Sequence, residues 1–139
     1  LLLRTLPKLV NHTAKSIPQD PQQVVFAPNI KHSEARLDFR WSARKIDCRV
    51  RGLRPDPGAY VMFNHRRTKI WDVTPADQTT HLKAGCVVSK TKHRLILAAG
   101  HSTTLQINVL QPAGKKRQRI TDYLNGAGQQ LKPGEQVIQ

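Results

Sequence analysis

The sequence predicts a small, mainly β domain folded as a Greek-key barrel, preceded by a helix, a proline-rich linker and one basic helix. Three observations lead to this prediction. Short runs rich in β-branched and aromatic residues recur between residues 59 and 110, separated by turn-forming residues. The connections between these runs are uneven in length. Residues 104–110 alternate apolar and polar side chains, as in a strand with one buried face. Closure into a barrel would hide the strand edges that a flat sheet exposes.

The first segment is predicted to be an amphipathic helix over residues 1–10. Leu2, Leu6 and Leu9 are among the apolar residues that share one helical face, although Pro7 is unfavourable inside a helix. Such a helix needs a surface to pack against, because it is too short to be stable alone. Residues 11–31 contain three prolines and many polar residues, which predicts an extended connector.

A second, basic helix is predicted over about residues 42–53. Ser42 is a suitable N-cap, and apolar residues then recur at spacings of three or four, at Ala43, Ile46, Val50 and Leu53. Pro55 and the following Pro57-Gly58 pair stop this helix.

Five strands are predicted after the basic helix, over residues 59–63, 68–73, 86–89, 94–98 and 104–110. The connections 64–67 and 90–93 are of hairpin length, whereas 74–85 is a longer loop. Thr121 is predicted to cap a short helix that ends at Gly126. Residues 131–137 are predicted to return as an edge strand.

The charge of the chain favours a polyanionic partner. The net charge is +14, from 23 Lys and Arg against 9 Asp and Glu, and the pI is near 10.6. Self-repulsion of this size destabilises a compact fold unless a polyanion neutralises it, so nucleic acid is the expected partner. An anionic membrane surface is the weaker alternative. No run of about 18 apolar residues is present, which excludes a helix that spans a bilayer.

No active site is predicted. Asn64-His65 between two strands is typical of a hairpin turn, and no carboxylate is placed by the sequence to orient the histidine as a base. The glycines are too dispersed for a phosphate-binding loop, and the histidines and cysteines lack metal-ligand spacing. Cys48 and Cys86 are predicted to be buried, small apolar residues in a reducing compartment. Neither a metal nor a cofactor is expected in this chain.

Basic residues concentrate in three clusters: the predicted basic helix with its flanks, the hairpin at 66–69, and the tract at 115–119. Solubility alone would need a net charge of only about 2 to 8 in a small domain. The seven aromatic residues are expected mostly in the core, which favours backbone contacts to a structured RNA over base stacking. The candidate RNA-binding residues are Arg44, Lys45, Arg49, Arg51, Arg54, Arg66, Arg67, Lys69, Lys115, Lys116, Arg117 and Arg119.

A family pattern runs through the chain, mainly in residues 35–60 and 110–126. It consists, in order, of Leu37-Asp38-Phe39, Arg51-Gly52-Leu53, Pro55-Asp56-Pro57-Gly58-Ala59, Lys69-Ile70, Leu110-Gln111 with Gly114-Lys115-Lys116, Asp122-Tyr123-Leu124 with Gly126, and Pro133-Gly134. In order, spacing and turn residues this resembles the C-terminal domain of methionyl-tRNA formyltransferase. The opening helix and linker are similar to the stretch that joins the two domains of that family.

The resemblance implies an open Greek-key barrel, similar to an oligonucleotide-binding fold, over residues 36–139. Residues 1–35 would be the helix and linker from an N-terminal domain that is missing here. In the family that domain binds 10-formyltetrahydrofolate and carries the catalytic Asn, His and Asp. This chain would therefore be non-catalytic and would hold the initiator tRNA. The family's Lys-Lys pair corresponds to Lys115 and Lys116, and its basic helix end to Arg51.

Two departures from the family pattern leave an alternative open. Gly52 replaces the usual Ala, and Gln118 replaces a usual hydrophobic residue. The additional arginines (66, 67, 117 and 119) favour a mitochondrial protein, with the bacterial cytoplasm as the alternative. The chain could then be a formyltransferase C-domain homologue reused to bind ribosomal RNA beside ribosomal proteins, as in a mitochondrial ribosome. A third possibility, the formyltetrahydrofolate hydrolase or dehydrogenase class, would not need so positive a surface.

Overall fold

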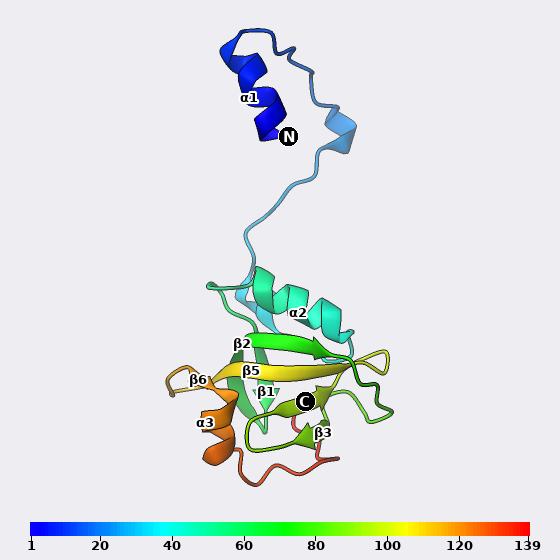
Figure 1. Cartoon of the computed structure of the whole chain (residues 1–139), viewed down its shortest axis with the longest axis vertical. Coiled ribbons are helices and arrows are strands. Elements are labelled where there is room, and N and C mark those ends of the chain that lie inside the picture. The colour runs from blue at the N-terminus through cyan, green and yellow to red at the C-terminus, as the bar shows by residue number, and fades with distance from the viewer.

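The structure is a computed structural model that describes residues 1–139. Figure 1 shows a compact β domain joined by an extended linker to a helix that lies away from it. The elements are α1 (Leu2–Val10), the 3-10 turns η1 (Pro21–Gln23) and η2 (His32–Ala35), α2 (Ala43–Gly52), β1 (Tyr60–Phe63), β2 (Arg66–Ala76), β3 (Val87–Lys90), β4 (Leu95–Ala98), β5 (Thr104–Pro112), β6 (Gln118–Arg119) and α3 (Ile120–Asn125).

The strands form one antiparallel sheet in the order β1-β2-β5-β4-β3. Strand β4 pairs with the first half of β5, and the short β6 pairs with its second half. Strands β3, β4 and β5 follow one another through short turns, and the long connection 77–86 lets β2 lie on the other side of β5. This arrangement is a Greek key, so the predicted mainly β topology is confirmed.

The C-terminal segment spans the gap between the two edges of the sheet. Ile138 forms an isolated bridge with Phe63 at the end of β1, and Gln136 forms one with Cys86 just before β3. The amide of Asn64 donates to the carbonyl of Val137 at 2.8 Å. Residues 131–137 were predicted to be an edge strand, but they make only these isolated bridges because they cross from one edge to the other. The domain is therefore an open barrel whose gap is partly filled.

The core lies between the inner face of the sheet, α2 and α3. From α2, Ile46 and Val50 are fully buried, as the predicted periodicity required. The Ser42 hydroxyl caps this helix by accepting from the amide of Lys45 at 3.4 Å. Burying one such aliphatic side chain stabilises the fold by roughly 1.5–3 kcal/mol. Figure 1 shows α2 lying along β2.

The β1–β2 hairpin has the turn that its sequence predicts. Asn64 and His65 both have positive φ values, 44° and 61°, and Phe63 pairs with Arg66 directly across the two-residue turn. Such turns match the right-handed twist of the strands they join. Strand β2 then continues to Ala76, further than the predicted 68–73, because its second half pairs along β5. The predicted loop 74–85 is shortened accordingly.

Two further local predictions were wrong. Cys48 is exposed, whereas Cys86 is buried as predicted, because residue 48 lies on the face of α2 opposite Ile46 and Val50. Thr121 does not cap α3. Pairing of residues 118–119 with β5 starts that helix directly after Arg119, which makes no capping hydrogen bond through its side chain.

The N-terminal segment makes a helix, as predicted, but buries none of its residues. The apolar side chains of α1, including Leu2, Leu6 and Leu9, are all exposed. The linker to the β domain is extended, apart from two single turns. No helix of the structure is long and apolar enough to cross a membrane.

Candidate nucleic-acid interface

Two of the three basic clusters meet on one edge of the β domain. The Arg66 guanidinium donates to the carbonyl of Ala113 at 2.6 Å, and the amide of Ala113 donates to the carbonyl of Arg67 at 2.9 Å. The turn that carries Lys115 and Lys116 is thereby fixed against the β1–β2 hairpin. Residues that are 47 positions apart in the sequence become neighbours because β2 pairs with β5. We call this surface, formed by residues 66–69 and 113–119, the basic edge.

Trp71 lies where the two clusters meet. The Lys69 ammonium is 5.6 Å from the centroid of its ring, and the Arg117 guanidinium is 4.9 Å from it. The indole Nε1–H donates to Oε1 of Gln111 at 2.9 Å, and the Gln111 side-chain amide donates to the carbonyl of Lys115 at 3.0 Å. One aromatic ring therefore contacts a cation from each cluster and is tied to the tract itself.

The cations of the basic edge are not neutralised by carboxylates. The ion pairs of the molecule are Arg40–Asp38, Arg51–Asp47 and Arg54–Asp72, and none includes a residue of the edge. The Arg67 guanidinium instead lies 4.1 Å from the centroid of the Tyr60 ring. A cation held by an aromatic ring keeps its full charge, so these side chains remain able to bind an anion.

A groove of about 580 Å³ runs beside these residues. It is lined by residues from three parts of the chain: Arg67, Lys69 and Gln111 on the strands, the turn 112–114, and His32 with Asp56-Pro57. Its lining is mainly polar and includes the two cations Arg67 and Lys69 and one carboxylate, Asp56, which forms no ion pair with either. A charged, hydrophilic ligand fits such a surface better than an apolar one.

In the third cluster, on α2, more of the cations already have a partner within the protein than at the basic edge. Asp47 accepts a hydrogen bond from Arg51 at 3.1 Å and raises the pKa of that guanidinium. Arg49 donates to the carbonyl of Glu34 at 2.6 Å, which ties the linker to the helix. Arg54 pairs with Asp72, whereas Arg44 and Lys45 have no carboxylate partner. The structure thus brings the hairpin and the tract together, whereas no hydrogen bond joins a cation of α2 to either of them.

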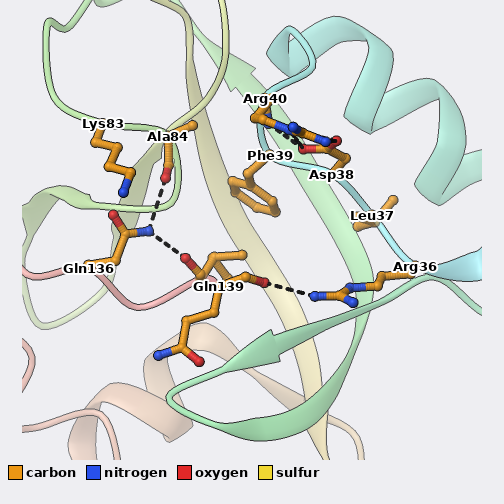
Figure 2. A pocket seen from close by; sticks show the side chains of 10 residues that line it. Arg36, Leu37, Asp38, Phe39, Arg40, Lys83, Ala84, Gln136 and Gln139 are labelled. Carbon is orange, nitrogen blue, oxygen red and sulfur yellow. Dashed lines mark hydrogen bonds and ion pairs between the residues drawn. The ribbon is translucent and has the colours of Figure 1, made fainter.

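A second cleft, of about 640 Å³, lies between residues 36–40 and the C-terminal segment (Figure 2). Figure 2 shows that its polar groups mostly bind one another: Arg36 donates to the carbonyl of Gln139, and the Gln136 side chain donates to that of Ala84. The hydrogen bond from Arg40 lowers the pKa of Asp38 below its usual value. Most polar groups of this cleft therefore have hydrogen-bond partners inside the cleft, whereas the cations of the basic edge have no carboxylate partner.

Most of the seven aromatic residues serve the core, as predicted, because Phe39, Phe63 and Tyr123 belong to it and Trp41 and Tyr60 pack against it. Phe39, Phe63 and Tyr123 are buried, but Tyr60, Trp41 and Trp71 are only partly buried. Each of these three rings holds at least one Lys or Arg side chain. Trp71 is the functional candidate that sequence reasoning missed. Its signal was the run "KIW", in which Lys69 and Trp71 alternate outward with Ile70 between them.

Comparison with known families identifies the domain. Residues 29–128 match the model of the formyl transferase C-terminal domain. The chain belongs to this family. The match covers the linker end, α2 and the whole sheet, including every candidate RNA-binding residue. The resemblance inferred from the sequence motifs is therefore confirmed.

Curated relatives agree with this assignment. The chain is 52% identical to the methionyl-tRNA formyltransferase of Pediococcus pentosaceus over 138 residues, which is 99% of this chain and 43% of that protein. It is 52% identical to the methionyl-tRNA formyltransferase of Levilactobacillus brevis over 139 residues, 100% of this chain and 44% of that protein. The chain thus spans less than half the length of these relatives. Both are bacterial proteins, so they give no support to the mitochondrial or ribosomal predictions.

Solved structures agree with the fold. HypX from Aquifex aeolicus superposes with a TM-score of 0.65 at 16% identity, over 95% of this chain and 24% of that one. A HypX structure in complex with tetrahydrofolic acid superposes equally well, with a TM-score of 0.65. At this identity the likeness concerns the fold of the formyl transferase C-terminal domain alone.

Proposed function

We propose that this chain is the tRNA-binding part of a bacterial methionyl-tRNA formyltransferase and that it holds the initiator tRNA by its phosphates. The observation that carries the proposal is the convergence of the hairpin and the 115–119 tract on one edge without a neutralising carboxylate. The choice of tRNA as the bound RNA rests on the two named relatives, which are both methionyl-tRNA formyltransferases.

Binding would rest mainly on ion pairs between the basic edge and the RNA backbone. Each Lys or Arg that contacts a phosphate releases condensed counterions, so affinity should fall steeply as salt increases. The side chains of Lys115, Lys116 and Arg117 are exposed and can follow an RNA groove. Arg44 and Lys45 on α2 would extend the surface. Arg51 and Arg54 would contribute less, because each is already paired with a carboxylate, whereas Arg49 is held only by a backbone carbonyl and keeps its charge.

The same proposal assigns different roles to the two segments of the chain. Residues 36–139 form the RNA-binding domain, with its own core. Residues 1–35 connect it to the rest of the enzyme, and the exposed apolar face of α1 would pack against that preceding part. The relatives are more than twice as long as this chain, which leaves room for a separate catalytic domain. The binding of 10-formyltetrahydrofolate and the transfer of the formyl group would belong to that domain.

The test is the affinity of this 139-residue chain for initiator tRNA, an elongator tRNA and an unrelated structured RNA across a salt series. The proposal predicts steeply salt-dependent binding, with a preference for tRNA that persists near physiological salt. Equal binding of all three RNAs would indicate a general phosphate-binding surface and contradict the proposed tRNA selectivity. Absence of RNA binding would overturn the proposal entirely.

A further inference from the structure

We infer that Trp71 and the groove beside it form a subsite for one unpaired nucleotide of the bound RNA. The base would stack on the indole ring, and its phosphate would bind Arg67 and Lys69 in the groove. This inference rests on the proposed RNA-binding function and adds a contact that a purely electrostatic surface would not need.

The first argument is the backbone geometry at Trp71. The register of β2 against β5 shifts between Ile70, which pairs with Leu110, and Asp72, which pairs with Val109. Trp71 is the extra residue of this β-bulge and has no partner on β5. A bulge turns two successive side chains to the same face, and here Trp71 and Asp72 both lie on the outer face while Ile70 and Val73 are buried. The fold thus adds an outward-facing tryptophan to the basic edge.

The second argument is that the ring is already held in one orientation. The hydrogen bond from its Nε1 to Gln111, and the bond from Gln111 to the carbonyl of Lys115, leave the indole no freedom to rotate without losing a partner. A platform that is ordered before binding loses little conformational entropy when a base stacks on it. A tryptophan that served only to pack against the core would not need these two hydrogen bonds on the solvent-facing side of the sheet.

The third argument is the pair of cations on the ring. Lys69 and Arg117 both lie against the indole, and neither has a carboxylate partner. A phosphate binds a cation more strongly than an exposed aromatic ring does. When RNA approaches, these side chains can therefore move to its phosphates and uncover the ring for a base.

The groove supplies space for the sugar and phosphate. Lys69 and Gln111, two residues that contact the indole, also line the groove, together with Arg67. Its volume of about 580 Å³ and its polar lining suit a single nucleotide unit rather than an apolar ligand. Base-paired RNA cannot use this subsite, because its bases are stacked inside the helix.

The experiment compares Trp71→Leu and Trp71→Phe in the full 139-residue chain, with two RNA probes: initiator tRNA and a blunt, fully paired RNA duplex. Trp71→Leu should weaken tRNA binding roughly five- to a hundredfold, the range expected when one base no longer stacks. The slope of log affinity against log salt should stay unchanged, because every phosphate-binding cation is retained. Trp71→Phe retains a ring and should restore most of the affinity. Duplex binding should be unaffected by either variant.

Phe26→Leu is the matched control, since Phe26 is 86% exposed in the linker and is not one of the residues that line the groove or contact Trp71. It should leave tRNA binding unchanged. The inference is overturned if Trp71→Leu weakens duplex and tRNA binding equally, or if it weakens neither while wild-type RNA binding is intact. Failure of the proposed function itself would appear differently, as wild-type chain that binds no RNA. If Trp71→Leu does not fold, quenching of Trp71 fluorescence by tRNA but not by duplex, in a Trp41→Phe background, tests the same contact.

Discussion

Replacing Lys115 and Lys116 by Ala should flatten the salt dependence of RNA binding without destabilising the fold. Both side chains are exposed and make no hydrogen bond or ion pair within the protein. The turn that carries them is fixed by backbone groups, through Ala113 and the carbonyl of Lys115, which the substitutions retain. The thermal stability of the double variant should therefore equal that of the wild type, so a change in binding can be attributed to charge.

The size of the effect follows from the two ion pairs to RNA phosphates that the double variant cannot form. Each such ion pair contributes about 0.7–0.9 to the slope of log affinity against log salt, so removing two reduces the slope by about 1.5. Between about 50 and 200 mM salt, a slope change of that size corresponds to about eightfold. The affinity ratio of wild type to variant should thus be about eight times larger at the lower salt concentration. Fluorescence anisotropy of labelled initiator tRNA across a salt series measures both slopes.

The control is Lys83→Ala with Lys92→Ala, which removes the same charge elsewhere. Both lysines are exposed, and Lys92 lies in the β3–β4 turn, at the edge of the sheet opposite β1. The control variant should keep the wild-type slope and lose little affinity at any salt concentration, because its lysines contact no phosphate. Equal flattening in the two double variants would refute a localised binding surface.

Three other changes test the packing, an ion pair and a buried phenol of the β domain. Gly100→Ala should destabilise the fold by about 3 kcal/mol or more in urea unfolding, because its Cβ would lie 1.7 Å from the carbonyl oxygen of Arg40, and an unchanged midpoint would contradict this packing. Asp72→Asn should free Arg54, steepening the salt slope by up to about one unit while costing less than about 1 kcal/mol, since the pair is a third or more exposed. Burial raises the pKa of Tyr123 above 10.0, so folding stability should fall as pH rises beyond that value, and Tyr123→Phe should lose less stability there in thermal unfolding.

Much of the architecture could be predicted from local sequence patterns. The Ser42 cap, the apolar spacing of α2 and the Asn64-His65 turn each depend on residues close together in the chain, and all three were confirmed. The residues that make up the basic clusters could also be identified from the sequence. The arrangement of these clusters in space could not be predicted. It depends on the pairing of β2 with β5, in which residues about 40 positions apart, such as Ile70 and Leu110, become neighbours. Periodicity shows which face of a strand is buried but not which strand lies next to it.

The position of Trp71 shows a second limit of sequence patterns. Simple alternation along β2 would place Lys69 and Trp71 outward and Asp72 inward. The bulge at Trp71 changes this alternation, so that Asp72 also lies outward, where it pairs with Arg54 and accepts from Asn108 at 2.9 Å. A bulge adds one residue and reverses the facing of every later residue in the strand until it is compensated. Asn108 is in turn an extra residue of β5, between Val109 and Ile107, so the pairing register between the two strands is restored while Val73 stays buried.

The distribution of acids gives the strongest physical argument for a polyanion at the basic edge. The chain has nine acidic residues, enough to neutralise several of its cations, yet the three ion pairs form around the linker end, α2 and the middle of β2. At the basic edge, aromatic rings and backbone carbonyls hold the cations instead. These partners position a cationic side chain without cancelling its charge, and they compete weakly with a phosphate. A surface that served only solubility would gain nothing from such positioning, whereas a surface that binds RNA phosphates requires both features.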